Sequence, residues 1–250
     1  MQRVMLPHVD IVRHSLEQMR LLVVGGIPFG VVVAGVGSRL LMLLLRVTSP
    51  DNVRGIQSDD DFEIGRFTLG GTYNLLLLGA GVGIIGIGTY QLVAPHLLGP
   101  SWFRGITVGL ASGAVVGSLL LHADGIDFTL LKPTWLAITC FIALPAVFGL
   151  LVGPAFAAVK KPTSWTRRRP WLVVVPLICV VCFPPVLVLL AFLSPIVVLG
   201  AAVASSPDVQ QLRSSTAWIN IMRALWMGIA LLGLVAVIRD ISQITASSTG

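Results

Sequence analysis

Charged side chains are scarce in this sequence of 250 residues, where Asp, Glu, Lys and Arg together make up 11%. An ordinary soluble domain carries about 25%. The scarcity is concentrated in long stretches without any charge, which cover 21–38, 67–103, 105–121, 133–159 and 171–207. Because hydrophobic residues make up 55% of the chain, a water-soluble fold could not bury so much apolar surface. The composition therefore excludes an ordinary soluble protein.

Cysteine is also rare, and the three cysteines all lie inside apolar stretches, at Cys140, Cys179 and Cys182. This placement excludes the disulfide framework of small secreted domains. Cys179 and Cys182 have the spacing of a redox pair, but no neighbouring histidine or charge stabilises a thiolate there. We expect three buried thiols. An enzyme that uses this cysteine pair, or His122, ranks third as a functional hypothesis, after the two given below.

Motifs that bind nucleotides or metals, or that carry hydrolase chemistry, are lacking too. The sequence has no Walker loop, no HExxH, no GxSxG and no zinc-finger spacing. Residues 81–86 match the letters GxGxxG, but they lack the preceding strand and the later acidic residue of a dinucleotide site. The sequence therefore predicts no catalytic residue, no cofactor and no metal, and we do not expect an enzyme.

What the sequence does contain is a series of membrane-spanning segments. A bilayer core about 30 Å thick needs roughly 20 mostly apolar residues per helical crossing. Six segments meet this length, at 21–46, 72–93, 102–121, 135–159, 171–199 and 218–238. The first is too long for the apolar part of a cleaved signal peptide. We predict an all-α membrane protein, a bundle of about six transmembrane helices in one domain, 21–250.

The distribution of Lys and Arg predicts the orientation, because cations near span ends resist translocation. The loop 160–170 carries five cations and no acidic residue. We therefore expect this loop and the N-terminus in the cytoplasm, and the chain in a bacterial cytoplasmic (inner) membrane. Alternation then places six basic residues at the outer face, namely Arg46, Arg54, Arg66, Lys132, Arg213 and Arg223.

Six crossings would put both termini on the cytoplasmic side. The fifth segment, 171–199, leaves this open because it contains four prolines, at Pro176, Pro184, Pro185 and Pro195. It forms either one kinked span or two half-helices that enter and leave by one face. The second alternative puts the C-terminus outside.

Two extramembrane segments have recognisable patterns. Within 1–20, apolar residues from Val9 onward recur at spacings of three and four, which predicts a cytoplasmic amphipathic helix, either on the inner leaflet or leading into the first span. In the outer loop, 47–71, two short segments at 53–58 and 62–69 flank three aspartates. This pattern predicts a small β-hairpin-like cap between the first two spans.

Glycines in the third predicted span fall four residues apart, at Gly105, Gly109, Gly113 and Gly117. This spacing leaves one helix face without side chains, so that another helix can pack closely in lipid. Glycine pairs elsewhere repeat the spacing, at Gly26 with Gly30, Gly79 with Gly83, and Gly149 with Gly153. We predict tight helix packing, either within the chain or with another subunit.

Four polar residues are candidates for function. Arg39 lies inside the first span, where a central charge costs about 2.5–3.5 kcal/mol. Arg39 is seven residues before Arg46, which places it about 10 Å below the membrane surface at 1.5 Å per residue. Its side chain either extends to the interface, pairs with a carboxylate or binds an anionic headgroup. His122, Asp124 and Asp127 follow the third span, and form either a cation or proton site or a polar turn.

Part of the sequence resembles a known family. The segments GSRLLMLLLR, TSPDNVRG and SDDDFEIGRFTLGG within 37–71, and HADGIDFTLLKPTWLAI at 122–138, are similar to a family of uncharacterised bacterial multi-pass integral membrane proteins. The likeness covers roughly the first 155 residues. It implies a helical membrane protein and assigns no reaction and no residue roles.

Two functional hypotheses from different classes follow. The first is a non-catalytic structural or accessory subunit that packs with itself or with other membrane proteins. The alternative is a small-solute or lipid transporter or channel-like protein that uses Arg39 and the His122, Asp124 and Asp127 cluster. Net charge is +6, and the basic residues gather at span ends, so we expect membrane lipids as partners and no nucleic acid.

Overall fold

The protein is described by a computed structural model that covers residues 7–50, 68–121, 132–164, 168, 184–204 and 206–248. These residues are helical or lie in short turns, and no strand occurs among them. Six helices are long and apolar enough to cross a membrane, which agrees with the predicted multi-pass helical protein. The predicted hairpin cap falls on 51–67, outside the described residues.

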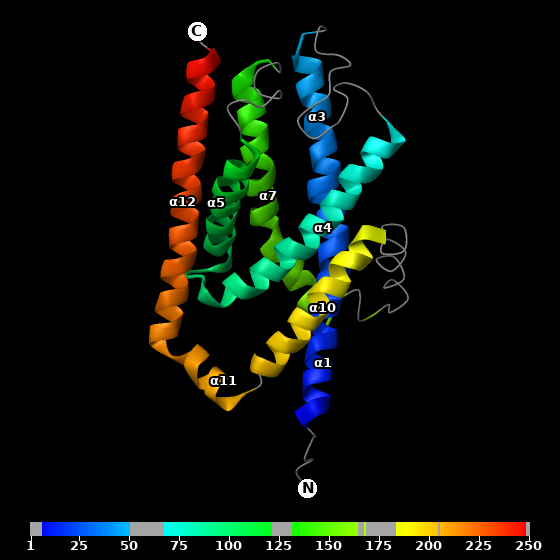
Figure 1. Ribbon diagram of the computed structural model, residues 1–250, viewed down its shortest axis with the longest axis vertical. Helices are drawn as coiled ribbons and strands as arrows, with labels where there is room; N and C mark the ends of the chain where they lie inside the picture. The colour runs from blue at the N-terminus through cyan, green and yellow to red at the C-terminus, as the bar shows by residue number, and fades with distance from the viewer. Residues whose placement is uncertain are drawn as a thin grey trace.

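The first 42 described residues form one unbroken helical rod from Pro7 to Thr48 (Figure 1). The predicted lead-in helix and first span are thus collinear parts of the same rod. In order, its parts are α1 (Pro7–Arg20), η1 (Leu21–Gly26), α2 (Ile27–Gly30), η2 (Val31–Val36) and α3 (Gly37–Thr48). The segments η1 and η2 are wide π turns on either side of Pro28. Such turns accommodate a proline that cannot donate the usual backbone hydrogen bond.

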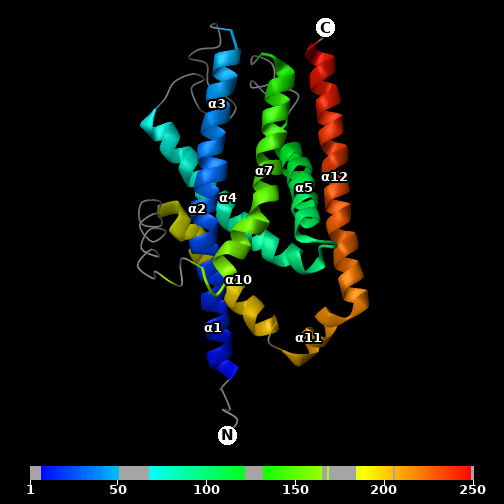
Figure 2. The same cartoon turned by 180° about the vertical axis from the view of Figure 1, so that it is seen from behind.

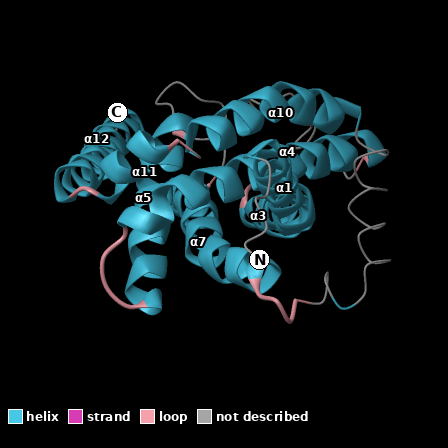
Figure 3. Cartoon of the chain, turned by 90° about the horizontal axis from the view of Figure 1, so that it is seen from below, coloured by secondary structure: helices cyan, strands magenta, loops and turns pink. Residues whose placement is uncertain are grey.

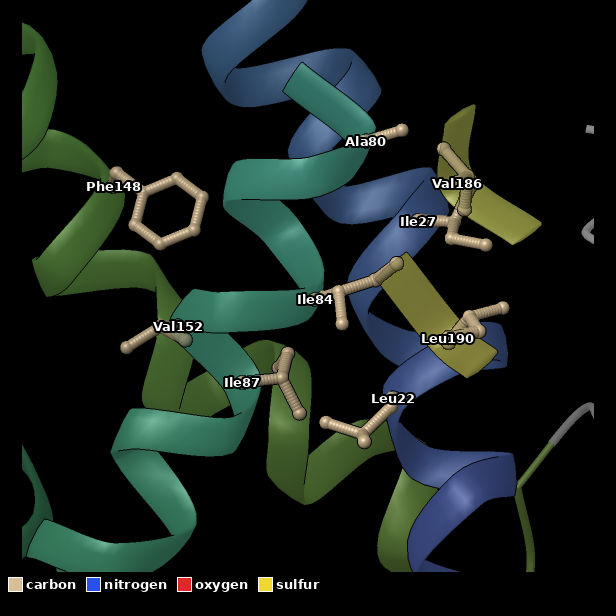
Figure 4. Packing of buried hydrophobic residues seen from close by; sticks show 9 residues of the cluster. All are labelled: Leu22, Ile27, Ala80, Ile84, Ile87, Phe148, Val152, Val186 and Leu190. Atoms are coloured by element: carbon tan, nitrogen blue, oxygen red, sulfur yellow. The ribbon is translucent and has the colours of Figure 1, made fainter. Parts of the chain in front are cut away.

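Helix α4 (Leu69–Val93) crosses this rod at very short distance. Thr68 caps its first turn, since the Thr68 hydroxyl accepts a hydrogen bond from the Gly71 N–H at 3.1 Å. Around the crossing, buried apolar side chains from the rod, α4, α7 (Thr134–Lys160) and α10 (Pro184–Ala204) form one core cluster (Figure 4). Ile27 and Ile84 are completely buried there.

A second layer is built from α5 (Ser101–Leu120), α7 and α12 (Thr216–Ser248). Figure 3 shows α7 between α5 and the rod, so this helix joins the two layers. Its Phe148 packs 4.7 Å from the Phe29 ring of the rod, measured between ring centres. Its Ala137 and Ile138 instead join a cluster with Val237 of α12.

The two ends of the bundle can be identified from contacts between elements. At the N-terminal end, Arg20 Nη2 donates to Val159 O at 3.3 Å, so α1 and the last turn of α7 are neighbours. At the opposite end, Ile244 of α12 is buried in one cluster with Leu45 of α3. Ser49 of the rod also bonds there to the Lys132 backbone, at 3.1–3.2 Å.

The first and last helices therefore end at opposite ends of the bundle, as Figures 1 and 2 also show. Of the two alternatives left open for 171–199, this arrangement fits the one that separates the C-terminus from the N-terminus. The physical reason lies between Lys160 and Pro207. Helix α7 ends at the N-terminal end, and the short helix α11 (Pro207–Ser214), which leads into α12, lies at that same end. The described helices on either side of this stretch, α7 and α11, therefore meet the same end of the bundle. Of that segment, α10 is described and 171–183 is not.

Candidate functional site

The four predicted glycines of α5 all face α7. A Cβ placed on Gly109 would lie 3.0 Å from Ala146 O, and one on Gly113 would lie 3.0 Å from the Ala146 Cβ. At Gly117 the nearest atom would be Ile142 Cγ1 at 3.3 Å, while Gly105 faces Leu150 at 3.5 Å. The glycine face thus serves packing within the chain.

The glycine pairs serve the same purpose. Gly26 and Gly30 of the rod meet Gly79 and Gly83 of α4, backbone against backbone. Gly149 of α7 lies against Ser112 of α5. Gly200 of α10 and Gly228 of α12 are different, because a Cβ on either would meet nothing within 4 Å.

Arg39 lies in the first turn of α3, two helical turns before Arg46. Its side chain is half-buried and its Nε atom is buried. Beside it, Gly37 approaches Leu144 of α7, where an added Cβ would lie 2.8 Å from that leucine's Cδ1. Arg39 is thus partly shielded, and its proposed role stays a prediction.

The remaining candidates fall on segments outside the described residues, namely His122, Asp124, Asp127, Cys179 and Cys182. The structure neither joins them to Arg39 nor separates them from it. In the described part of the chain, no three His, Cys, Asp or Glu residues come together as a metal site. The third cysteine, Cys140, is a buried free thiol, as expected.

A polar site that the sequence did not reveal lies at the N-terminal end, between α4 and α12. Helix α4 passes into the short 3-10 helix η4 (Ala94–His96), and Gly99 then takes a positive φ of 82° that suits glycine. This turn presents the His96 carbonyl to α12, where Arg223 Nε donates to it at 3.1 Å. Arg213 on α11 is also close enough to interact electrostatically with His96.

Further donors surround this contact. Arg104 Nε donates to Gly99 O at 2.8 Å, which fixes the start of α5 on the same turn. The Nδ1 atom of His96 and the Nε1 atom of Trp226 are buried and make no hydrogen bond. Among the described residues, no carboxylate forms an ion pair with Arg213 or Arg223. We define Arg213, Arg223, His96 and Trp226 as the α11–α12 basic site.

Sequence reasoning missed this site because it counted 171–199 as a full crossing. That count assigned Arg213 and Arg223 to the outer face, away from His96 and Arg104. The signal that could have found the site is the run of four prolines, since a segment that turns back returns the next arginines to the face of the 94–101 loop.

Other polar contacts gather at the same end. Arg20 forms an ion pair with Glu17 at 2.9 Å, in addition to its bond to Val159 O. Lys160 Nζ lies 5.3 Å from the centre of the Phe156 ring, in the range of a cation–π contact. The N-terminal end of the bundle is thus predominantly basic.

Comparison with known proteins adds no relative. No family model, no curated protein and no solved structure matches this chain. The resemblance of the first 155 residues to a family of bacterial membrane proteins stays a prediction.

Proposed function

We propose that the protein is a non-catalytic accessory component of a membrane, which associates laterally with other membrane protein subunits through α10 and α12. The observation that carries this proposal is the open space at Gly200 and Gly228, where an added Cβ would meet no described residue within 4 Å. Gly70 in the first turn of α4 is open as well, whereas the glycines where α5 meets α7 and where α4 crosses the rod are packed. Glycine lowers helix stability by about 1 kcal/mol relative to alanine. A glycine that no described residue approaches has no packing role within the described part of the chain.

The burial of the two helices supports the same conclusion. In the most apolar window of α10 and of α12, 11% of the residues are buried, against 28–44% in the other four candidate spans. Seen from below, both helices lie at the periphery of the bundle (Figure 3).

Exposure alone does not argue for a partner, because lipid tails are as apolar as leucine and exert no hydrophobic force between helices. Small residues four apart do favour helix contact, since they let backbones approach closely. On α12, Ala224 and Gly228 have this spacing, and Leu232 continues the same face. On α10, Gly200 and Ala204 have this spacing, and Ile196 precedes them on the same face.

The proposal includes an orientation with the N-terminal end in the cytoplasm. Described basic residues at that end include Arg20, Arg104, Lys160, Lys161, Arg168, Arg213 and Arg223, whereas Arg46, Lys132 and Arg239 lie toward the opposite end. The corrected positions of Arg213 and Arg223 increase the excess of cations at the N-terminal end. Such an excess marks the cytoplasmic face.

Site-specific photo-cross-linking in cells tests the association. A photoreactive residue replaces Leu232 on α12 or Phe192 on α10, which are 73% and 71% exposed. The matched control is Leu110 on α5, which is 69% exposed but has no open glycine beside it. We expect discrete cross-linked protein bands from positions 232 and 192 and only lipid adducts from 110.

Two results would contradict the proposal. Lipid adducts alone at all three positions would show that α10 and α12 face only the bilayer. Equal protein cross-linking from position 110 would show that crowding, and not a specific face, accounts for the bands. A Gly228→Leu variant provides a second measurement, because the added side chain should abolish the band from position 232.

A further inference from the structure

The α11–α12 basic site has the features of an anion site at a membrane surface. Arg223 is half-buried, and its Nε–H is already committed to the His96 carbonyl at 3.1 Å. This bond holds the guanidinium plane in one orientation and leaves the two terminal NH2 groups for another acceptor. Paired N–H groups on a planar guanidinium match the oxygens of a phosphate group in a bidentate manner.

Within the described part of the chain, no carboxylate balances the charge of Arg223. Arg213 adds a second guanidinium from α11, which is also close enough to interact electrostatically with His96. Asp208, in the first turn of α11, is exposed and forms no ion pair with either arginine in the described structure. A half-buried cation without a carboxylate is costly unless an anion from outside the chain pairs with it.

The surface next to Arg223 shows what kind of molecule brings the anion. Met227 and Leu231 lie four and eight residues further along α12, on the same helical face as Arg223. Their side chains are 59% and 61% exposed. A cationic group at the end of the span with an apolar stripe above it matches a lipid, whose phosphate lies at the interface and whose acyl chain lies along the helix.

We propose that Arg213 and Arg223 bind the phosphate group of an anionic phospholipid in the leaflet at the N-terminal end, with the acyl chain along Met227 and Leu231. This site lies on a different face of α12 from Ala224, Gly228 and Leu232. It is therefore independent of the proposed protein association, and the two can fail separately.

Native mass spectrometry of the full-length protein in mild detergent tests the site by titration with dioleoylphosphatidylglycerol. We expect the Arg213→Gln/Arg223→Gln variant to bind this lipid at least tenfold more weakly than the unaltered protein, which corresponds to about 1.4 kcal/mol. The matched control is Arg46→Gln/Lys132→Gln, which removes two cations at the opposite end and should bind as the unaltered protein does. Dioleoylphosphatidylcholine, with no net charge, should bind more weakly throughout.

Unchanged lipid binding in the Arg213→Gln/Arg223→Gln variant, or an equal loss in the control, would overturn the proposal. Inorganic phosphate at millimolar concentration that displaces the lipid completely would overturn the lipid assignment and indicate a site for a free anion. If the Arg213→Gln/Arg223→Gln variant does not fold, lipid binding by an Arg213→Lys/Arg223→Lys variant tests the proposal instead. It keeps both charges but lacks the planar fork, so we expect binding at least threefold weaker, and unchanged binding would refute the bidentate contact.

Discussion

Replacement of Gly83 by alanine tests the close crossing of α4 over the first rod. The added Cβ would overlap Gly26 O and lie 2.7 Å from Gly30 Cα. Carbon atoms in contact normally lie about 3.5–4.0 Å apart, so the two helices must separate by about 1 Å. Because both obstructing atoms belong to backbone, no side chain can rotate away to make room.

The expected loss of stability follows from two opposing terms. Overpacking of a close interface costs about 1–3 kcal/mol, and a backbone clash belongs at the upper end of this range. Alanine returns about 1 kcal/mol through its higher helix propensity. The net loss is then about 2 kcal/mol, or about 4–8 °C in Tm for a chain of this size.

The assay is thermal unfolding in mild detergent, followed by intrinsic tryptophan fluorescence. Gly200→Ala and Gly228→Ala are the matched controls, because each adds the same methyl group where nothing lies within 4 Å. We expect these two variants to melt at or slightly above the temperature of the unaltered protein. A Gly83→Ala variant that melts with the controls would refute the close backbone contact, and so would controls that lose as much as Gly83→Ala.

Two further predictions concern topology and the core. Alkaline phosphatase fused after Lys161 should be inactive and a C-terminal fusion active, because the two positions lie at opposite ends of the bundle. An active fusion after Lys161, or two inactive fusions, would contradict the proposed orientation. Phe148→Ala should lower stability by about 3–5 kcal/mol because Phe148 is buried against Phe29. Phe192→Ala, at an exposed position, should leave the melting temperature unchanged.

Much of the fold could be predicted from local sequence. Charge-free stretches of about 20 residues specify helices in a bilayer, because each residue must satisfy its backbone groups within the helix. The four glycines of α5 likewise revealed a packing face, since their spacing of four residues can be seen in the sequence without knowing the partner helix. Their partner could not be predicted, because a bare helix face accepts α7 and another subunit equally well.

The direction of the last helices stayed open between two alternatives, because hydropathy counts apolar residues and does not show on which side of the membrane a segment ends. The stretch 171–199 is apolar enough for a crossing, yet α12 ends beside Leu45 at the end opposite the N-terminus. Counting this stretch as a full crossing also separated Arg213 and Arg223 from His96. A site assembled from α4, α11 and α12 depends on which ends of the helices meet.

The sequence by itself determined a bundle of helices long and apolar enough to span a membrane, with cations gathered near the helix ends, because the cost of burying charge in hydrocarbon acts on each segment separately. Only the tertiary structure decided how the helices pair. It brought Gly30 against Gly79 and Gly83, packed the glycine face of α5 against α7, and left Gly200 and Gly228 without a described neighbour. These outcomes depend on contacts between residues far apart in the chain, and no local pattern encodes which contact forms.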